Sequence, residues 1–128
     1  MTREELNKLS TIILDASITV HREMGPGLLE SIYILCLVHE LQERGVHVLT
    51  EVSIPVNYKG IVLSKDLRID IIVEEEIILE IKSVEPLLLV HQAQIISYLK
   101  LADKRLGFLI NFNVPVLKDG FKRFVNNF

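Results

Sequence analysis

Apolar residues follow a helical spacing through the first third of the chain. Between residues 4 and 23 they recur every three or four positions, as the buried face of an amphipathic helix does: Leu6, Leu9, Ile13, Ala16 and Val20. Gly25-Pro26-Gly27 interrupts this pattern, and helical spacing resumes over residues 28–44 before Gly45 supplies a C-terminal stop. The sequence therefore predicts two helices before any strand.

Short runs of β-branched and other apolar residues replace the helical spacing from Val46 onward. They predict strands at 46–57, at 61–63 together with 67–73, and at 77–82, with turns at Tyr58-Lys59-Gly60 and Glu74-Glu75-Glu76. Because both connections are short enough for hairpins, a three-stranded antiparallel meander is the simplest arrangement.

The last third of the chain predicts one further helix and one further buried strand. The helix is expected from about Leu87 to Asp103, and the apolar run Leu106 to Phe112 predicts the strand. A loop and then a short strand or turn are expected around Phe121 to Val125. No repeat or linker interrupts the order α-α-β-β-β-α-β, so residues 1–128 are expected to form one α/β domain.

Composition supports an ordinary globular domain and narrows its setting. Of 128 residues, 49% are hydrophobic and 24% are charged, which excludes a disordered, collagen-like or coiled-coil chain. The single cysteine, Cys36, cannot form an intramolecular disulfide, so a reducing, cytoplasmic location is expected. No apolar stretch is long and charge-free enough to cross a bilayer, and no membrane partner is expected.

Net charge and its distribution point in different directions. The net charge of −3 argues against a generic polyanion binder. Residues 1–99, however, carry 8 basic and 15 acidic side chains, or −7, while residues 100–128 carry 6 basic and 2 acidic ones, or +4. The C-terminal part of the chain could therefore face a phosphate group.

Three charged residues interrupt strands that are otherwise apolar on both faces. If Glu74-Glu75-Glu76 forms a three-residue hairpin loop, Asp70 falls opposite Glu80, and Lys82 shares their face. Two opposed carboxylates are unfavourable unless something compensates their charge. A divalent cation would compensate both, and oxygen ligands of this kind suit Mg²⁺ or Mn²⁺. The alternative is that both carboxylates face solvent on an edge hairpin, paired with Lys82 or Arg68.

Polar side chains on the predicted helices have both ordinary and functional interpretations. Glu30 and Tyr33 share a helix face, where Glu30 could complement the helix dipole and Tyr33 could pack in the core. His91, Gln94 and Tyr98 form a polar row on an apolar helix, and polar groups on a packed face need partners. His91 is expected at most to contact a residue of the site, without touching metal or substrate itself. The other histidines show no ligand spacing: His21, His39 and His47.

Together these motifs resemble the PD-(D/E)xK phosphodiesterase superfamily and, within it, the G-x-x-E-x-x-Y family. The resemblance covers nearly the whole chain and rests on residues that match in order and spacing: Gly27, Glu30 and Tyr33; Asp70; Glu80-Ile81-Lys82; Gln94 to Tyr98, which resembles the Q-x-x-x-Y motif of RecB-type nucleases; and Gly107 to Gly120. The one departure is Ile69, which stands where proline often precedes the first aspartate.

The resemblance implies a restriction-endonuclease-like core, α-β-β-β-α-β, with a mixed central sheet flanked by helices. By analogy, the Mg²⁺ or Mn²⁺ ligands would be Asp70, Glu80, Glu30 and the carbonyl of Ile81. Lys82 would hold or activate the attacking water, and positioning and charge stabilisation are preferred for it over base catalysis. Gln94 and Tyr98 would orient the water or the phosphate.

The expected activity is metal-dependent hydrolysis of phosphodiester bonds in nucleic acid, with DNA expected ahead of RNA and a homodimer compatible with the high aliphatic content. A non-catalytic module that keeps the fold and binds nucleic acid or protein is the alternative, although an aromatic content of 6% with no tryptophan offers no evident platform for stacking bases. A hydrolase of another small phosphate ester is a third possibility.

Overall fold

A five-stranded mixed sheet forms the centre of the protein, as a computed structural model of residues 1–128 describes it. The strands lie in sequence order, and the elements are α1 (Arg3–Met24), α2 (Glu30–Glu43), β1 (Val48–Tyr58), β2 (Ile61–Val73), β3 (Ile77–Lys82), α3 (Leu89–Leu101), β4 (Leu106–Asn111), α4 (Leu117–Gly120) and β5 (Phe121–Val125). The expected α/β architecture is confirmed, and the elements follow the expected order α-α-β-β-β-α-β before α4 and β5. None of the helices is long and apolar enough to cross a membrane.

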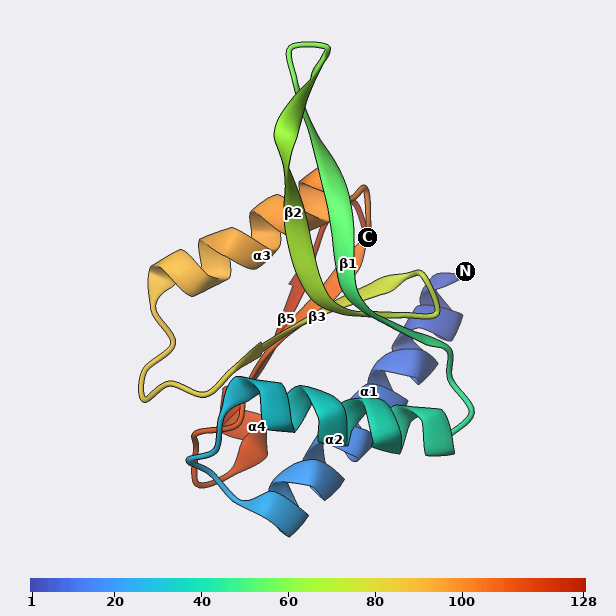
Figure 1. Ribbon diagram of the computed structural model, residues 1–128. Helices are drawn as coiled ribbons and strands as arrows, with labels where there is room; N and C mark the ends of the chain where they lie inside the picture. The colour runs from blue at the N-terminus through green and yellow to red at the C-terminus, as the bar shows by residue number, and fades with distance from the viewer.

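Helices cover both faces of the sheet (Figure 1). The larger core lies on the side of α1 and α2, where alternate residues of β3, such as Leu79 and Ile81, meet buried residues of both helices. The smaller core lies on the side of α3, where Ile72 and Ile78 pack around Leu99. Because side chains alternate across a strand, residues 78, 80 and 82 of β3 face α3.

The parallel pair β3 and β4 is the most deeply buried part of the sheet. Its register runs from Ile77 opposite Leu106 to Lys82 opposite Asn111. All residues of β4 are buried, and so are those of β3 apart from Lys82. Parallel strands covered on both faces are expected to read as continuous apolar runs, so the two polar residues of β3 stand out.

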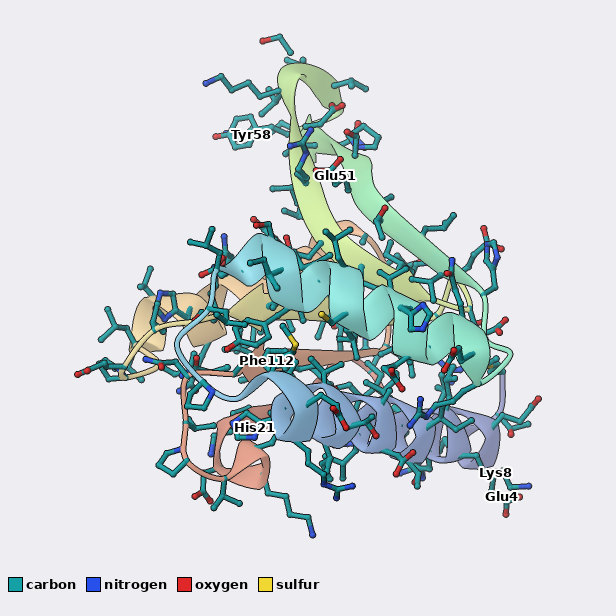
Figure 2. The ribbon with its side chains drawn as sticks, turned by 60° about the horizontal axis from the view of Figure 1, so that its bottom comes forward. Glu4, Lys8, His21, Glu51, Tyr58 and Phe112 are labelled. Atoms are coloured by element: carbon teal, nitrogen blue, oxygen red, sulfur yellow. The ribbon has the colours of Figure 1, made fainter.

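The hairpin of β1 and β2 projects beyond the rest of the sheet (Figures 1 and 2). β2 pairs with β3 only through residues 71–73, whereas it pairs with β1 from Ile61 to Val73. Consequently the far end of the hairpin has no sheet neighbour, and its apolar side chains are open to solvent: Tyr58, Ile61, Val62 and Leu63.

The hairpin connecting β2 and β3 follows the predicted register. Val73 pairs with Ile77 across the three-residue loop, as the spacing predicts. Glu74 and Glu75 adopt positive φ angles of 53° and 57°, and the Glu74 carboxylate accepts a hydrogen bond of 2.8 Å from the His47 amide. The loop therefore reverses the chain without glycine.

Several predicted boundaries need correction. β2 is one continuous strand, not two runs, although its pairing with β1 shifts register between the pairs Pro55–Asp66 and Asn57–Val62. Tyr58 belongs to β1, leaving Lys59 and Gly60 as the turn, and α2 begins at Glu30 rather than at residue 28. The single-turn helix α4 was not predicted, since four residues carry no periodic signal.

Candidate functional site

The ladder between β2 and β3 ends beside Asp70. Its last pair is Ile71 with Leu79, and the next amide on β3 that faces β2 is bonded to a side chain. The Ile81 N–H donates to Asp70 Oδ2 at 2.9 Å. A carboxylate thus takes the place of a backbone acceptor, and the strands open where the charged residues lie.

Glu80 is a buried carboxyl group beside Asp70. The residue is 4% exposed, and its Oε1 has no hydrogen-bond partner. Burial, together with the hydrogen bond and charge of Asp70, raises the pKa of Glu80 to about 9, although Lys82 acts in the opposite direction. Without a compensating cation, this carboxyl group holds a proton at neutral pH.

The solvent-facing alternative for these carboxylates does not fit the structure. β3 lies in the middle of the sheet rather than at its edge. The ion pairs of the structure do not include Asp70, Glu80, Lys82 or Arg68. A buried carboxyl oxygen without a partner, next to a second carboxylate, is the donor set that a divalent cation would satisfy.

α3 brings the second group of predicted residues to the same face. Gln94 Nε2 donates to Tyr98 Oη at 2.9 Å. Burial raises the pKa of Tyr98, and the nearby charges of Glu80 and Asp70 raise it further. Gln94 and Tyr98 therefore share one face of α3, as the helical spacing predicted, and Tyr98 lies near the two carboxylates.

An open hollow of about 420 Å³ lies between the end of β3 and α3, lined by Lys82, Val90, His91, Ala93, Gln94 and Ser97. Lys82 and Gln94 were predicted as site residues, whereas Ser97 was missed. His91 also borders the hollow, and its Nδ1 accepts a hydrogen bond from the Leu88 amide at 3.0 Å, which tethers the start of α3. A serine on a helix gives no sequence signal of its own.

Glu30 reaches the end of β3 from the opposite layer. Its Oε2 accepts a hydrogen bond of 3.3 Å from the Ser83 amide, and Ser83 Oγ donates to the Leu28 carbonyl at 2.6 Å. Glu30 thus contacts Ser83, the residue that follows Lys82. The carboxylates of Glu30, Asp70 and Glu80 do not form one cluster.

Tyr33 fixes the turn that precedes Glu30. Its hydroxyl donates to the Gly25 carbonyl at 2.5 Å and accepts from the Leu28 amide at 3.1 Å. Its buried ring stacks on Phe112, with centroids 4.5 Å apart. Gly27 has a φ of 94°, a conformation that favours glycine. Both Gly27 and Tyr33 thus hold the turn that presents Glu30.

Asn111 joins the ends of the two parallel strands. Its Oδ1 accepts from the Val84 amide at 3.1 Å, and its Nδ2 donates to the Val84 carbonyl at 2.8 Å. The residue is 1% exposed. Asn111 had no predicted role, although a polar residue at the end of an apolar strand is a signal that could have singled it out.

A second group of metal-ligand side chains lies on α2. The ligand atoms of His39, Glu40 and Glu43 all lie within 4.8 Å of one another, although the sequence showed no ligand spacing at His39. These groups already have protein partners, because His39 lies 3.1 Å from Glu43 and Arg44 lies 2.8 Å from Glu40. This cluster is fully explained by its ion pairs.

Comparison with known proteins places the chain in a family. A family model described as the PD-(D/E)XK nuclease superfamily matches residues 7–124. Among solved structures, the crystal structure of SSO0001 is similar at 28% sequence identity and a TM-score of 0.52, over 73% of this chain and 47% of that one. This chain thus spans about half the length of SSO0001. No curated protein matches it.

The family match and the geometry agree. The match includes all strands that carry the predicted residues, and the mixed five-stranded sheet with flanking helices is consistent with a restriction-endonuclease-like fold. Because the match covers nearly the whole chain, this protein belongs to the PD-(D/E)XK nuclease superfamily.

Proposed function

We propose that the protein is a metal-dependent nuclease that hydrolyses phosphodiester bonds. Proteins of the superfamily generally use divalent metals and act on nucleic acid. The observation that carries the proposal is the unpartnered, buried Oε1 of Glu80 beside Asp70, with Lys82 on the same face of β3. A buried, unpartnered carboxyl group beside a second carboxyl group is costly to maintain for structure alone.

Asp70, Glu80 and the Ile81 carbonyl are the proposed ligands of Mg²⁺ or Mn²⁺. The Ile81 N–H faces Asp70. The C=O of the same residue points toward the same side of the strand, because the two backbone groups of a β-residue face one neighbour. A bound divalent cation would supply Lewis acidity and lower the pKa of a water molecule. Glu30 is proposed to contribute to the metal site indirectly, through the hydrogen bond that it accepts from the Ser83 amide at the end of β3.

Lys82, Gln94 and Tyr98 are proposed to handle the water and the phosphate. Lys82 lines the hollow with Gln94, so both side chains border the space that a phosphate would occupy. The Lys82 ammonium would stabilise the charge that develops on the phosphate. Gln94 donates to Tyr98, which leaves the Tyr98 hydroxyl proton free to donate to a water or a phosphate oxygen.

We also propose membership of the G-x-x-E-x-x-Y family. Its support is that Gly27, Glu30 and Tyr33 act as one structural unit, in which a glycine-dependent turn and a buried tyrosine present the glutamate at the start of α2. A cytoplasmic location agrees with the single unpaired Cys36.

A cleavage assay tests the proposed function. Purified protein is incubated with single- and double-stranded DNA and RNA plus Mg²⁺ or Mn²⁺, and we expect DNA to be cleaved in preference to RNA. Asp70→Asn and Lys82→Ala should each lower the rate at least about 100-fold, the usual scale for losing one electrostatic contributor to catalysis. Lys65→Ala, on the projecting hairpin, is the control and should cleave like wild type.

The same assay separates the alternatives. A binding module without catalysis would cleave nothing, would tolerate Asp70→Asn, and would lose nucleic-acid affinity when the exposed basic residues of the C-terminal part are neutralised: Lys118, Lys122 and Arg123. A hydrolase of small phosphate esters would act on a chromogenic phosphodiester but not on DNA or RNA. Cleavage that survives both Asp70→Asn and Lys82→Ala would count against the proposed site.

A homodimer is the assembly we propose, because α3 leaves apolar side chains uncovered. Leu89 is 83% exposed and Val90 is 64% exposed, beside the hollow that Lys82 lines. Only Ile95 and Leu99 of this helix are buried. An apolar surface of this kind on a soluble domain is typical of a contact with another chain.

A further inference from the structure

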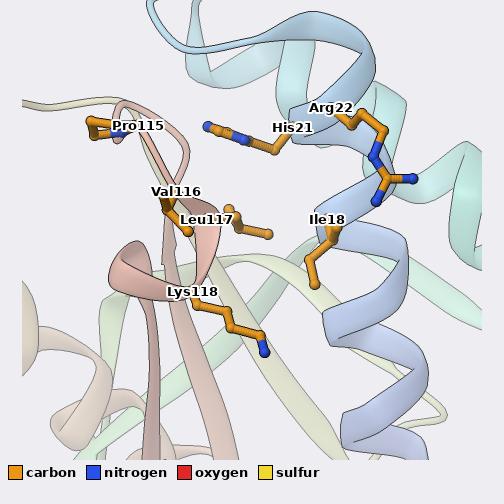
Figure 3. Close-up of a pocket in the computed structure, with 7 residues that line it drawn as sticks. All are labelled: Ile18, His21, Arg22, Pro115, Val116, Leu117 and Lys118. Carbon is orange, nitrogen blue, oxygen red and sulfur yellow. The ribbon is translucent and has the colours of Figure 1, made fainter.

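A hollow between α1 and α4 carries basic side chains that the candidate site does not use. Its volume is about 340 Å³, and Figure 3 shows the residues that line it: Ile18, His21, Arg22, Pro115, Val116, Leu117 and Lys118. We propose that this α1–α4 hollow binds a phosphate of the nucleic-acid backbone that flanks the scissile one. The inference rests on the proposed function, because it concerns how the same substrate is held.

Two basic side chains without ion-pair partners give the hollow its positive charge. Arg22 projects from the last turn of α1 and Lys118 from α4, and both side chains are exposed. Neither belongs to the ion pairs of the structure. Glu23 follows Arg22 in sequence but lines a different hollow, between α1 and α2. No acidic side chain lines the hollow, so two basic residues on its walls favour an anion there.

A role in complementing the helix dipole explains only part of this arrangement. Arg22 does lie in the last turn of α1, where basic residues are favourable. Lys118, however, comes from an element almost 100 residues later, and nothing in the dipole of α1 requires it on the facing wall. The presence of both residues around one hollow is therefore a feature of the tertiary structure.

His21 fixes the width of the hollow. Its Nε2 lies 2.7 Å from the Val114 carbonyl oxygen, and because a carbonyl only accepts, the ring nitrogen donates. This bond ties the end of α1 to the loop that follows β4. His21 is therefore a positioning residue, which holds the helix carrying Arg22 against the segment carrying Lys118.

The α1–α4 hollow lies at the same end of the sheet as the candidate site. Val84, just beyond β3, is bonded to Asn111 at the end of β4, and the chain continues from there to the loop that His21 holds. A further hollow is lined by Pro26, Glu85, Asn113, Val114 and Pro115, and it shares Pro115 with the α1–α4 hollow. This further hollow thus adjoins both the segment after β3, through Glu85, and the α1–α4 hollow, through Pro115. In α/β sheets, ligands bind at the carboxyl ends of the parallel strands.

The chemistry of the walls suits a nucleotide more than a free anion. Arg22 can offer a fork of donors to two phosphate oxygens, and Lys118 adds a point charge. Ile18 and Val116 supply apolar walls against which a sugar can pack. A volume of about 340 Å³ is at the lower end of the range for small-molecule sites, which suits one phosphate with its sugar.

An oligonucleotide-binding titration tests the proposal. The anisotropy of a fluorescein-labelled DNA oligonucleotide is followed in EDTA, so that no cleavage occurs, at several NaCl concentrations. Arg22→Ala/Lys118→Ala should weaken binding about tenfold or more and should lower the slope of log affinity against log salt by about 2. Lys8→Ala/Lys65→Ala removes the same two charges from other surfaces and should change both quantities far less. Thermal unfolding of both double variants verifies that they fold.

The outcomes separate this proposal from the proposed function. Equal losses in the two double variants would show an effect of net charge alone and would overturn the site. Unchanged binding by Arg22→Ala/Lys118→Ala, with wild-type protein that cleaves DNA, would overturn the site and leave the nuclease intact. Inorganic phosphate that binds at lower concentration than the oligonucleotide would assign the hollow to a free anion and would overturn it too.

Discussion

Asp70 accepts a hydrogen bond from the backbone of Ile81, the residue after Glu80, and forms no ion pair with a basic side chain. The Asp70 carboxylate accepts the Ile81 amide at 2.9 Å, at the point where the β2–β3 ladder ends. One side chain thereby opens the ladder and satisfies the amide that the opening exposes. It also holds a negative charge beside a buried carboxyl group. The site is consequently built into the hairpin itself, and the properties of Glu80 follow from that geometry.

We predict that the stability of the metal-free protein falls as pH rises. The pKa of Glu80 is about 9 in the folded state and near its ordinary value of 4.5 in the unfolded state. Between these values the folded state holds a proton that the unfolded state has lost, so alkaline pH favours unfolding. The loss should be on the order of 2 kcal/mol between pH 6 and pH 8, measured by urea unfolding in EDTA.

Glu80→Gln supplies the control for this prediction. The amide cannot ionise, so the variant should lose most of the pH dependence and should exceed wild type in stability at pH 8. Glu85→Gln, an exposed carboxylate beyond the end of β3, should keep the wild-type dependence. Parallel pH profiles for wild type and Glu80→Gln would contradict the assignment of the proton to Glu80.

Metal binding should release a proton at neutral pH. A divalent cation needs the ionised carboxylate, and Glu80 is protonated at pH 7 because its pKa is about 9. Calorimetric titration with Mn²⁺ in two buffers of different ionisation enthalpy should therefore show release of about one proton, with affinity that rises from pH 6 to pH 8. Glu80→Gln should bind more weakly and release none. Binding without proton release would place the cation elsewhere.

The sequence allowed the core of the site to be predicted, because charges in apolar strands are conspicuous and a three-residue loop fixes a register. Val73 pairs with Ile77 as expected, and this places Asp70 near Glu80. Helical spacing likewise placed Gln94 and Tyr98 on one face of α3, where they are hydrogen-bonded to each other. These inferences used local periodicity and loop length, both of which are properties of the chain itself.

Features that depend on tertiary packing were beyond the reach of the sequence. The bonds of Asn111 to Val84 join segments 27 residues apart, and no local pattern encodes them. The contact of Glu30 with Ser83 crosses from one helical layer to the end of β3. The α1–α4 hollow depends on α4, whose four residues are too few to predict a helix.

Tyr33→Phe should destabilise the protein without disturbing its core packing. The ring and its stacking on Phe112 remain, but the Gly25 carbonyl and the Leu28 amide lose their hydroxyl partner. The expected loss is about 1–2 kcal/mol in urea unfolding. Because the turn presents Glu30, metal affinity should fall as well. Tyr58→Phe, at the exposed hairpin tip, should leave both quantities unchanged.

Leu89→Lys should shift the protein toward the monomer. The substitution places a charge on the most exposed apolar side chain of α3, which the proposed dimer contact would bury at a cost of several kcal/mol. Sedimentation velocity over a range of protein concentrations measures the change. Leu29→Lys is a matched control, because Leu29 is 69% exposed at the start of α2. A wild-type protein that stays monomeric at all concentrations would contradict the dimer.

Gly120→Ala should be strongly destabilising because of a backbone contact and not because of strain in φ. A Cβ atom at this position would collide with the carbonyl oxygen of Asn111 and lie 3.1 Å from Val114 Cγ2. The carbonyl belongs to the end of β4, so it cannot move without disturbing the bonds between Asn111 and Val84. We expect a loss of about 2–3 kcal/mol in urea unfolding, the scale of overpacking in a buried site.

Gly60→Ala isolates the effect of a positive φ, since Gly60 has a φ of 81° and no atom near its Cβ position. That variant should lose only about 1 kcal/mol, the cost of a strained non-glycine residue. Equal losses at the two positions would show that the close approach of Gly120 to Asn111 is not what requires glycine there.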